Sequence, residues 1–365
     1  MKKPSICISP IDWGLGHATR CISLIQSLQT LGYEVYIATE GYQEAILKEA
    51  FPNAHFLKLR GYRIKYAHWG FVLPIVLLLQ IPKIIYSIVY EHKWLRNAQK
   101  KYQFDFVISD NRFGFYHQQI PSVFITHQLN LQMHFAWATR LFQNIQYAWL
   151  KHFTACWIPD IAGDNNLSGV LSNPLEKPST PLWYMGCLSR LKNIPHSIQS
   201  IASENSTVFL GIISGPEPQR TLLENLLWKA GNEQNIKFVL TAGTPNNKAA
   251  FQKNNNAILY PHLEAAALVS EIQRAEYIIC RGGYTTLMEL IPFKKKLIFI
   301  PTPGQTEQVY LGLLWQEKNW ALCYAQENFN LSIALKKASN FNFEQPPFSD
   351  FSIDALEKAI QQLTN

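Results

Sequence analysis

Charged residues are scarce in this sequence: they make up 16% of its 365 residues, whereas hydrophobic residues make up 47%. Disordered chains need the opposite balance, so this composition excludes extensive disorder and favours buried cores throughout. A chain of this length is too long for one ordinary core, and two compact domains are expected. The sequence shows no internal repeat of short period and no low-complexity tract.

Signatures of nucleic-acid binding are also missing. The sequence has no zinc-finger spacing, no aromatic RNA-binding signature and no long run of lysine or arginine. Its formal net charge of +7 suits smaller anionic partners, among them nucleotides, phospholipids and lipid diphosphates. We therefore expect such an anion, and no nucleic acid, as the partner.

The N-terminus lacks the apolar core of a secretory signal, because Met1–Pro4 leads directly into a strand-like segment. The six cysteines are scattered and several lie within apolar runs, which is typical of reduced core thiols. Both features predict a cytoplasmic location. The cysteines are Cys7, Cys21, Cys156, Cys187, Cys280 and Cys323.

Short apolar strands alternate with helical stretches in both halves of the chain, which predicts α/β domains with parallel sheets. We place an acceptor-side domain at residues 1–195, a second domain at 196–345, and a linker with a closing helix at 346–365. Residues 188–206 and 341–350 are the expected hinges. The predicted strands are 5–9, 34–39, 104–109, 122–126, 207–213, 237–242, 276–280 and 297–300; the predicted helices are 18–31, 219–229, 263–274, 285–291, 307–316 and 353–363.

The most hydrophobic window, residues 71–90, is interrupted by prolines, a glutamine and Lys83. A membrane-spanning helix needs about 20 consecutive apolar residues, so a span is not expected. Basic residues surround the window within 60–101, and Tyr66, Trp69 and Tyr86 lie near its edges. The pattern fits a pair of core helices, and it equally fits peripheral contact with an anionic membrane at its inner face.

A glycine-rich loop at 12–17 follows the first strand, but Thr19 stands where the dinucleotide pattern G-x-G-x-x-G needs glycine, and the P-loop lysine is absent. His17 is therefore the informative residue of this loop. A neutral imidazole there can take a proton from a hydroxyl group, although a structural hydrogen bond is the simpler alternative. Asp110, at the end of a later strand, is a candidate to orient His17 or to hold an acceptor.

A second glycine turn follows the strand 276–280. Gly282 and Gly283 leave the N–H groups of the next helix open to an anion such as a diphosphate. Glu289, about one turn further along, suits the paired hydroxyls of a ribose. The loop 301–308 presents amides and a carboxylate at the same end of the sheet, and such groups match sugar hydroxyls.

In these motifs the sequence resembles the family 28 glycosyltransferases, which include MurG-type N-acetylglucosaminyltransferases and diacylglycerol glycosyltransferases, and more distantly the glucuronosyltransferases. The matching segments are 14–17, 214–216, 281–289 and 305–308. Where the family often has a loop richer in glycine, this chain has Pro216 and Pro218. The planar fork of Arg220 is a candidate to compensate by binding phosphate oxygens.

The resemblance implies a GT-B fold, with two Rossmann-like parallel-sheet domains facing across a cleft. It also implies an inverting transfer, without a metal, of a hexose or N-acetylhexosamine from a UDP-sugar to a lipid-linked or cell-envelope acceptor. His17 is the implied base, or a stabiliser of the departing charge. The candidate donor-binding residues are Gly16, Ser214, Gly215, Arg220, His262, Leu263, Arg281, Gly282, Gly283, Tyr284, Thr285, Thr286, Glu289, Gln305, Glu307 and Gln308.

Two other functions remain open at this stage, because a fold does not fix a function. One is a UDP-sugar 2-epimerase, which would need further acidic residues beside the donor sugar. The other is a non-catalytic subunit of an envelope assembly that binds nucleotide-sugar or lipid. No Asp-x-Asp pair is poised at a strand end to bind a metal, so neither a metal nor another cofactor is expected.

Overall fold

The computed structural model describes residues 3–14, 16–64, 79–131, 136–194, 207–244 and 251–364. Three parts of the sequence predictions lie outside these residues: Leu15 of the glycine-rich loop, the start of the apolar window at 71–78 with the nearby Tyr66 and Trp69, and the stretch 195–206 of the first expected hinge.

The described residues form two compact units. The first unit contains the described residues within Met1–Tyr66, Pro74–Arg190 and Pro347–Asn365. The second unit contains the described residues within Leu191–Pro346. The chain therefore leaves the first unit, builds the second, and returns to the first for its last residues.

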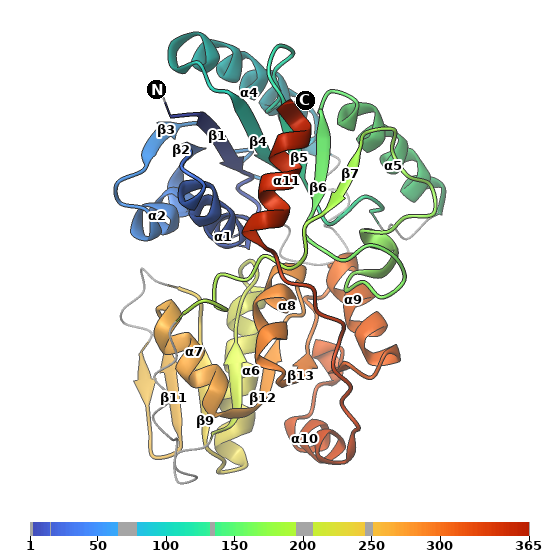
Figure 1. Ribbon diagram of the computed structural model, residues 1–365. Helices are drawn as coiled ribbons and strands as arrows, with labels where there is room; N and C mark the ends of the chain where they lie inside the picture. Colours follow the sequence, from blue (N-terminus) through green and yellow to red (C-terminus); the bar gives the residue numbers. More distant parts are fainter. Residues whose placement is uncertain are drawn as a thin grey trace. The chain divides into compact units, whose positions relative to one another are not determined.

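The first unit is built on a seven-stranded sheet of order β3-β2-β1-β4-β5-β6-β7 (Figure 1). All of its strand pairs are parallel. The chain runs outward from β1 to β3 and then returns to β4 on the other side of β1, so the topological switch point lies between β1 and β4. The strands are β1 (Ser5–Pro10), β2 (Glu34–Thr39), β3 (His55–Lys58), β4 (Phe106–Asp110), β5 (Ser122–Ile125), β6 (Ala155–Ile158) and β7 (Leu182–Tyr184).

Helices cover both faces of this sheet. On one face, Ile6 and Ile8 pack in a cluster with residues of α1 and α11. Cys7 points to the opposite face and packs with Leu95 and Ala98 of α4, as the two-residue period of a strand requires. The helices of the first unit are α1 (Gly16–Thr30), α2 (Gly41–Ala50), α4 (Ile81–Tyr102), α5 (Ala136–Leu150) and α11 (Ile353–Thr364), with a 3₁₀ turn at Gly169–Leu171.

The final helix, α11, belongs to the core of the first unit although it follows the second unit in sequence. Leu356, Ala359 and Ile360 are almost completely buried in the same cluster as Val123 of β5 and Trp157 of β6. Figure 1 shows α11 in red across this face of the sheet. An isolated parallel bridge between Cys187 and Asp350 leads the returning chain toward it.

The second unit repeats the same plan, with the strand order β10-β11-β9-β8-β12-β13-β14. Only the short β10 pairs antiparallel among its described strands. The switch point lies between β8 and β12. The strands are β8 (Thr207–Ile212), β9 (Phe238–Thr241), β10 (Gln252–Lys253), β11 (Ala257–Tyr260), β12 (Ala275–Cys280), β13 (Lys296–Phe299) and β14 (Ala321–Cys323).

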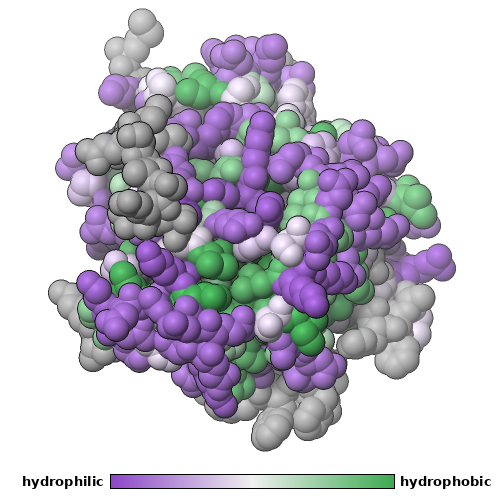
Figure 2. All heavy atoms as spheres, turned by 90° about the horizontal axis from the view of Figure 1, so that it is seen from below, coloured by the Kyte–Doolittle hydropathy of each residue, from purple (hydrophilic) through white to green (hydrophobic). Residues whose placement is uncertain are grey.

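One face of the second sheet packs against α6 and α10. Phe209, Phe238 and Ile279 of the strands form one buried cluster with Leu227 of α6 and Leu331 of α10. The helices of this unit are α6 (Gln219–Glu233), α7 (Ala265–Arg274), α8 (Tyr284–Leu290), α9 (Thr306–Glu317) and α10 (Leu331–Asn340), with 3₁₀ turns at Ile291–Phe293 and Gln326–Asn328. In the face shown in Figure 2, mostly hydrophilic side chains surround a smaller group of hydrophobic ones.

The prediction of two Rossmann-like α/β domains is confirmed, and the predicted strands are present; β2 has the predicted bounds Glu34–Thr39. All six cysteines are thiols, five of them buried and Cys323 partly buried. Within the described part of the chain, no helix has the length and apolar character needed to cross a membrane. Of the apolar window, Ile81–Tyr90 forms the start of α4.

Candidate active site

The polar residues predicted for the first domain meet at its switch point. His17 lies in the first turn of α1, directly after the loop that follows β1, and Asp110 is the last residue of β4. Nδ1 of His17 is 3.0 Å from Oδ1 of Asp110. The carboxylate is completely buried, whereas 15% of the His17 side chain is exposed. The structure thus brings together two candidate residues that are 93 positions apart in sequence.

Two further residues, which sequence reasoning missed, complete this cluster. Arg20 donates from Nε to Oδ2 of Asp110 over 2.8 Å and from Nη2 to Oδ1. The same Nη2 lies 2.9 Å from Nδ1 of His17, and Nη1 lies 3.3 Å from Nδ1 of His127, just beyond β5. The spacing of three between His17 and Arg20 on one helix was the available signal.

The contacts of Nδ1 allow two positions for the proton of a neutral His17 ring. A guanidinium group only donates hydrogen bonds. Nδ1 of His17 therefore accepts from Arg20 when it is unprotonated, and donates to Asp110 when it carries the proton. In the second arrangement the other ring nitrogen is free to take a proton, as a general base must.

Burial and charge set the protonation of this pair. Burial lowers the pKa of His17 below its ordinary value, and Arg20 acts in the same direction while Asp110 opposes it. Burial alone would raise the pKa of Asp110, but the charge of Arg20 and the neighbouring His17 hold it well below its usual range. At neutral pH the site therefore combines a neutral imidazole, a carboxylate and a guanidinium.

The loop that leads to His17 is held by its neighbours. Asp12 accepts from the backbone N–H groups of Tyr62 and Arg63, each over 2.7 Å. Gln43 donates to the carbonyls of Ile11 and Gly14, and Gly14 has a φ of +78° that favours glycine. The entry into α1 is thus fixed from both sides. Gly16, a candidate donor residue, is the first residue of this helix.

In the second unit, loops after β8, β12 and β13 come together beside the switch point. Gly215 follows β8 with a φ of +109°, and a Cβ placed there would lie 3.5 Å from Oγ1 of Thr302. Gly282 follows β12 with a φ of +69°, and a Cβ there would lie 3.0 Å from the Phe299 ring. Both positions therefore favour glycine, and Ser214 beside Gly215 is exposed.

Gln308 links two of these loops. Its Oε1 accepts from the backbone N–H of Thr302 over 2.8 Å, and its Nε2 would be 3.8 Å from a Cβ on Gly283. The buried hydroxyl of Thr302 has no hydrogen-bond partner within the described residues. Buried polar groups normally have partners, so this hydroxyl is available to a ligand or a water molecule.

The side chain of Arg281 points into the protein. It is almost fully buried and donates to the carbonyls of Ile300 and Gln219 and to Oε1 of Gln326. Burial lowers its pKa to about 10, so it remains charged at neutral pH. The sequence predicts this side chain among the donor contacts, but in the structure it donates to these protein acceptors instead.

Arg220 is likewise engaged with protein groups. It donates from Nε to Glu217 over 2.6 Å and from Nη1 to Glu224 over 2.7 Å. Both carboxylates would compete with a phosphate for this guanidinium, which weakens the expected phosphate contact. His262 is exposed and Leu263 is largely buried, and both follow β11, two strands away from β8.

The remaining candidates lie on α8 and at the start of α9. Tyr284 is buried, so only its backbone remains for a ligand. Thr285, Thr286 and Glu289 are partly exposed, as their spacing on one side of α8 predicts. Gln305 precedes α9, and Glu307 and Gln308 lie in its first turn, all three partly exposed.

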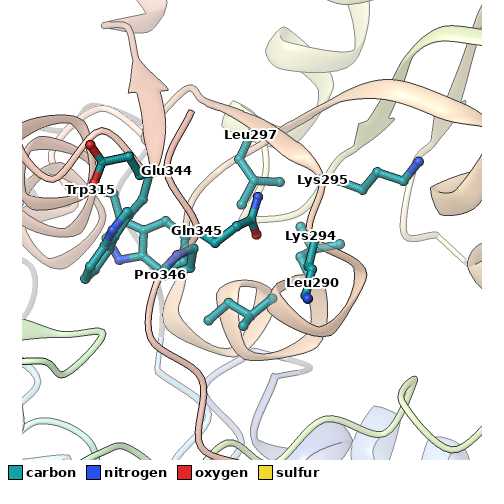
Figure 3. A pocket seen from close by; sticks show the side chains of 10 residues that line it. Leu290, Lys294, Lys295, Leu297, Trp315, Glu344, Gln345 and Pro346 are labelled. Atoms are coloured by element: carbon teal, nitrogen blue, oxygen red, sulfur yellow. The ribbon is translucent and has the colours of Figure 1, made fainter. Parts of the chain in front are cut away.

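A separate small pocket lies at the opposite end of β13 (Figure 3). Its lining includes Lys294, Lys295, Trp315 and Glu344. Nζ of Lys295 donates to the carbonyls of Gln273 and Ala275. None of the residues that line this pocket belongs to the glycine turns at Gly215 and Gly282. Within the described residues, no group of three or more His, Cys, Asp and Glu side chains is arranged to hold a metal.

Comparisons with known proteins agree with this architecture. Residues 217–361 match the model of the glycosyltransferase family 28 C-terminal domain. An uncharacterized glycosyltransferase of Methanosarcina acetivorans is 23% identical over 333 residues, which cover 84% of this chain and 82% of that protein. A UDP-N-acetylglucosamine–N-acetylmuramyl-(pentapeptide) pyrophosphoryl-undecaprenol N-acetylglucosamine transferase of Sulfurihydrogenibium sp. is 25% identical over 170 residues, 44% of this chain and 48% of that protein.

Solved structures show the same fold. The glycosyltransferase SnogD from Streptomyces nogalater matches with a TM-score of 0.63 at 15% identity, and the match covers 100% of both chains. MurG of Acinetobacter baumannii has a TM-score of 0.53 at 13% identity, with all of this chain and 91% of that chain covered. The protein is thus a glycosyltransferase of GT-B fold that resembles family 28.

Proposed function

We propose that this enzyme transfers a hexose or N-acetylhexosamine from a UDP-sugar to a hydroxyl of a lipid-linked or cell-envelope acceptor, with inversion and without a metal. The observation that carries the proposal is the pair of His17 and Asp110 at the switch point of the first sheet. A partly exposed imidazole that is hydrogen-bonded to a buried carboxylate has the geometry of a general base.

The second unit is the proposed donor side. The loops at Gly215 and at Gly282–Gly283 offer N–H groups to the diphosphate, and the positive φ angles of Gly215 and Gly282 favour glycine. The carboxylate of Glu289 is assigned to the ribose hydroxyls, and Glu307 and Gln308 are assigned to the sugar. The family 28 match supports these assignments, since it spans all three residues.

The proposed reaction proceeds in one step. The imidazole of His17 takes the proton of the acceptor hydroxyl as its oxygen bonds to the anomeric carbon. The bond between that carbon and the β-phosphate oxygen breaks, and UDP leaves with the electron pair. Attack opposite the leaving group inverts the anomeric centre. Asp110 stabilises the imidazolium that forms, as an ionised carboxylate beside it must.

The lipid-linked acceptor rests on two observations. The Sulfurihydrogenibium relative acts, by its name, on a pyrophosphoryl-undecaprenol acceptor. In this chain, the outward face of α4 is apolar in its first half, with Ile85, Tyr86 and Val89 each 46–58% exposed. Farther along the same helix the exposed residues include Lys93, Arg96 and Lys100. An apolar face followed by cations suits peripheral contact with an anionic membrane.

The test is release of UDP by the purified protein from a panel of UDP-sugars, with and without a membrane-lipid extract and with EDTA present. Acceptor-dependent release is expected, together with an inverted product. Inversion at C2 without an acceptor would instead identify a 2-epimerase. Tight UDP binding without any turnover would identify a non-catalytic subunit. Loss of turnover on addition of EDTA would overturn the metal-independent reaction.

His17→Ala should reduce the rate of transfer about 100-fold or more, because general-base catalysis contributes a factor of about 10²–10⁴ to a rate. UDP affinity should remain nearly unchanged, since the donor residues lie in the other unit. His55→Ala is the matched control, because His55 is an exposed histidine of the same unit that pairs with Glu34. Unaltered turnover in the His17 variant would refute its assignment as the base.

A further inference from the structure

Arg20 occupies an unusual position for a charged side chain. Only 1% of its surface is exposed, and it is among the largest fully buried side chains of the protein. Burying a guanidinium is costly unless it is paired and hydrogen-bonded. The pairing is the fork on both oxygens of Asp110 described above, which is the strongest geometry that the two groups can adopt.

The same guanidinium also contacts His17 directly. Its Nη2 is 2.9 Å from Nδ1 of His17, while Nδ1 is 3.0 Å from Asp110. One nitrogen of Arg20 therefore lies against both partners of the proposed catalytic pair. Its opposite edge meets His127, which ties β5 to the cluster.

We propose that Arg20 is the positioning residue of this site: by holding Asp110 and the Nδ1 edge of His17, it fixes the imidazole against β4 and sets how readily the ring takes a proton. This inference rests on the proposed function of His17 as a base. Arg20 does not need to touch substrate, because it acts through His17 and Asp110.

The charged and titratable groups around His17 determine the direction of the effect. They are Asp110 on β4, Arg20 on α1 and His127 beyond β5. The Asp110 carboxylate favours the imidazolium, and Arg20 disfavours it. With Arg20 present, the proton taken from an acceptor creates a second positive charge beside the first. The His17 ring therefore stays neutral down to a lower pH than it would in a His–Asp pair without Arg20.

The experiment follows the titration of His17 by NMR in the full chain labelled with ¹⁵N-histidine; His17→Gln identifies its signal. Arg20→Met should raise the titration midpoint by about 1 pH unit or more, the usual effect of one adjacent charge. Arg20→Lys, which keeps the charge but not the fork, should give a smaller rise. The acidic limb of kcat/KM should move upward with the midpoint, while KM for the UDP-sugar stays constant.

Arg63→Met provides the matched control. Arg63 also binds a carboxylate with two nitrogens, at 2.7 and 2.8 Å from Glu40, but its side chain is 57% exposed. Its loss should leave the His17 midpoint unchanged.

A second pair of variants covers the case in which Arg20→Met does not fold because Asp110 is left without its cation. Asp110→Asn and the double variant Arg20→Met/Asp110→Asn differ only at Arg20, and neither has a carboxylate at position 110. The His17 midpoint should be higher in the double variant. Equal midpoints in both comparisons would overturn the role of Arg20. The titration does not depend on turnover, so full transfer by His17→Gln would refute the proposed base separately.

Discussion

Two buried arginines of this protein are held in different ways. Arg20 meets a carboxylate, so that its charge is compensated within the site. Arg281 meets carbonyl oxygens and a side-chain amide, and no described carboxylate pairs with it. Its uncompensated charge lies directly before Gly282 in sequence. A fixed cation there adds positive potential for an anionic donor without contacting it.

Substitution of Glu289 should change the affinity for the donor nucleotide alone. Glu289→Ala should weaken UDP binding about 10-fold or more, because a hydrogen bond to a charged group contributes about 1.5–3 kcal/mol. Isothermal titration calorimetry with UDP measures the change. Glu276→Ala is the control, since Glu276 lies on β12 of the same sheet and forms an exposed ion pair with Lys296. An unchanged dissociation constant for the Glu289 variant would contradict the ribose assignment.

Sequence reasoning found His17 and Asp110 but not their neighbours. Charged residues on a helix are usually solvated, so Arg20 gave no sign of burial until β4 and β5 were placed beside it. His127 was visible only as a polar residue after a strand. The direction of the Arg281 side chain could not be predicted, because it depends on the carbonyls of Gln219 and Ile300, which come from distant segments.

At the scale of elements, the glycine turn after β12 gives a sharp prediction. Gly282→Ala should destabilise the protein by about 1–3 kcal/mol, because the left-handed φ is strained for alanine and the Cβ meets Phe299. UDP binding should weaken as well, since the turn shapes the proposed diphosphate site. Thermal unfolding and calorimetry measure the two effects.

Gly163→Ala is the control for this turn. Gly163 has a similar φ of +85°, but a Cβ there meets nothing within 4 Å. The Gly163→Ala variant should lose some stability, because its φ is strained for alanine, without any loss of UDP affinity. Equal UDP affinity in both variants would show that the turn at Gly282 does not form the donor site.

The outward face of α4 leads to a prediction about membranes. Ile85→Glu should reduce binding to vesicles of anionic phospholipid several-fold, because it places a charge in the apolar half of the face. Cosedimentation measures the change, and transfer to a water-soluble acceptor should be unaffected. Ile333→Glu is the control, since Ile333 is 62% exposed on α10 of the other unit. Equal loss of binding in both variants would argue against α4 as the contact surface.

Most of the buried strands could be predicted, although the fully buried β6 was not, and the edge strands could not be predicted. β4 and β12 are almost entirely buried, so they appear in the sequence as continuous apolar runs. β3 and β7 are partly exposed edge strands with mixed composition, and neither was predicted. Parallel pairing also depends on contacts between distant residues, so the strand order became visible only in the structure.

At the scale of the whole molecule, the return of the chain to the first unit should be essential to stability. Leu356→Ala should cost about 2–5 kcal/mol, because Leu356 is fully buried between the sheet and α11. Chemical denaturation measures the loss. Leu175→Ala is the control within the same unit, since Leu175 is 98% exposed. An equally stable Leu356 variant would show that α11 contributes little to this core.

The position of α11 also dictates when the enzyme can mature during translation. A ribosome delivers the first sheet early, yet the segment that closes its core emerges only after all of the second unit. Until then Ile6, Val123 and Trp157 lack one of their packing partners. The half that carries the proposed base therefore completes its folding only after the second unit has been synthesised, and a chain that stops before α11 yields no finished first unit.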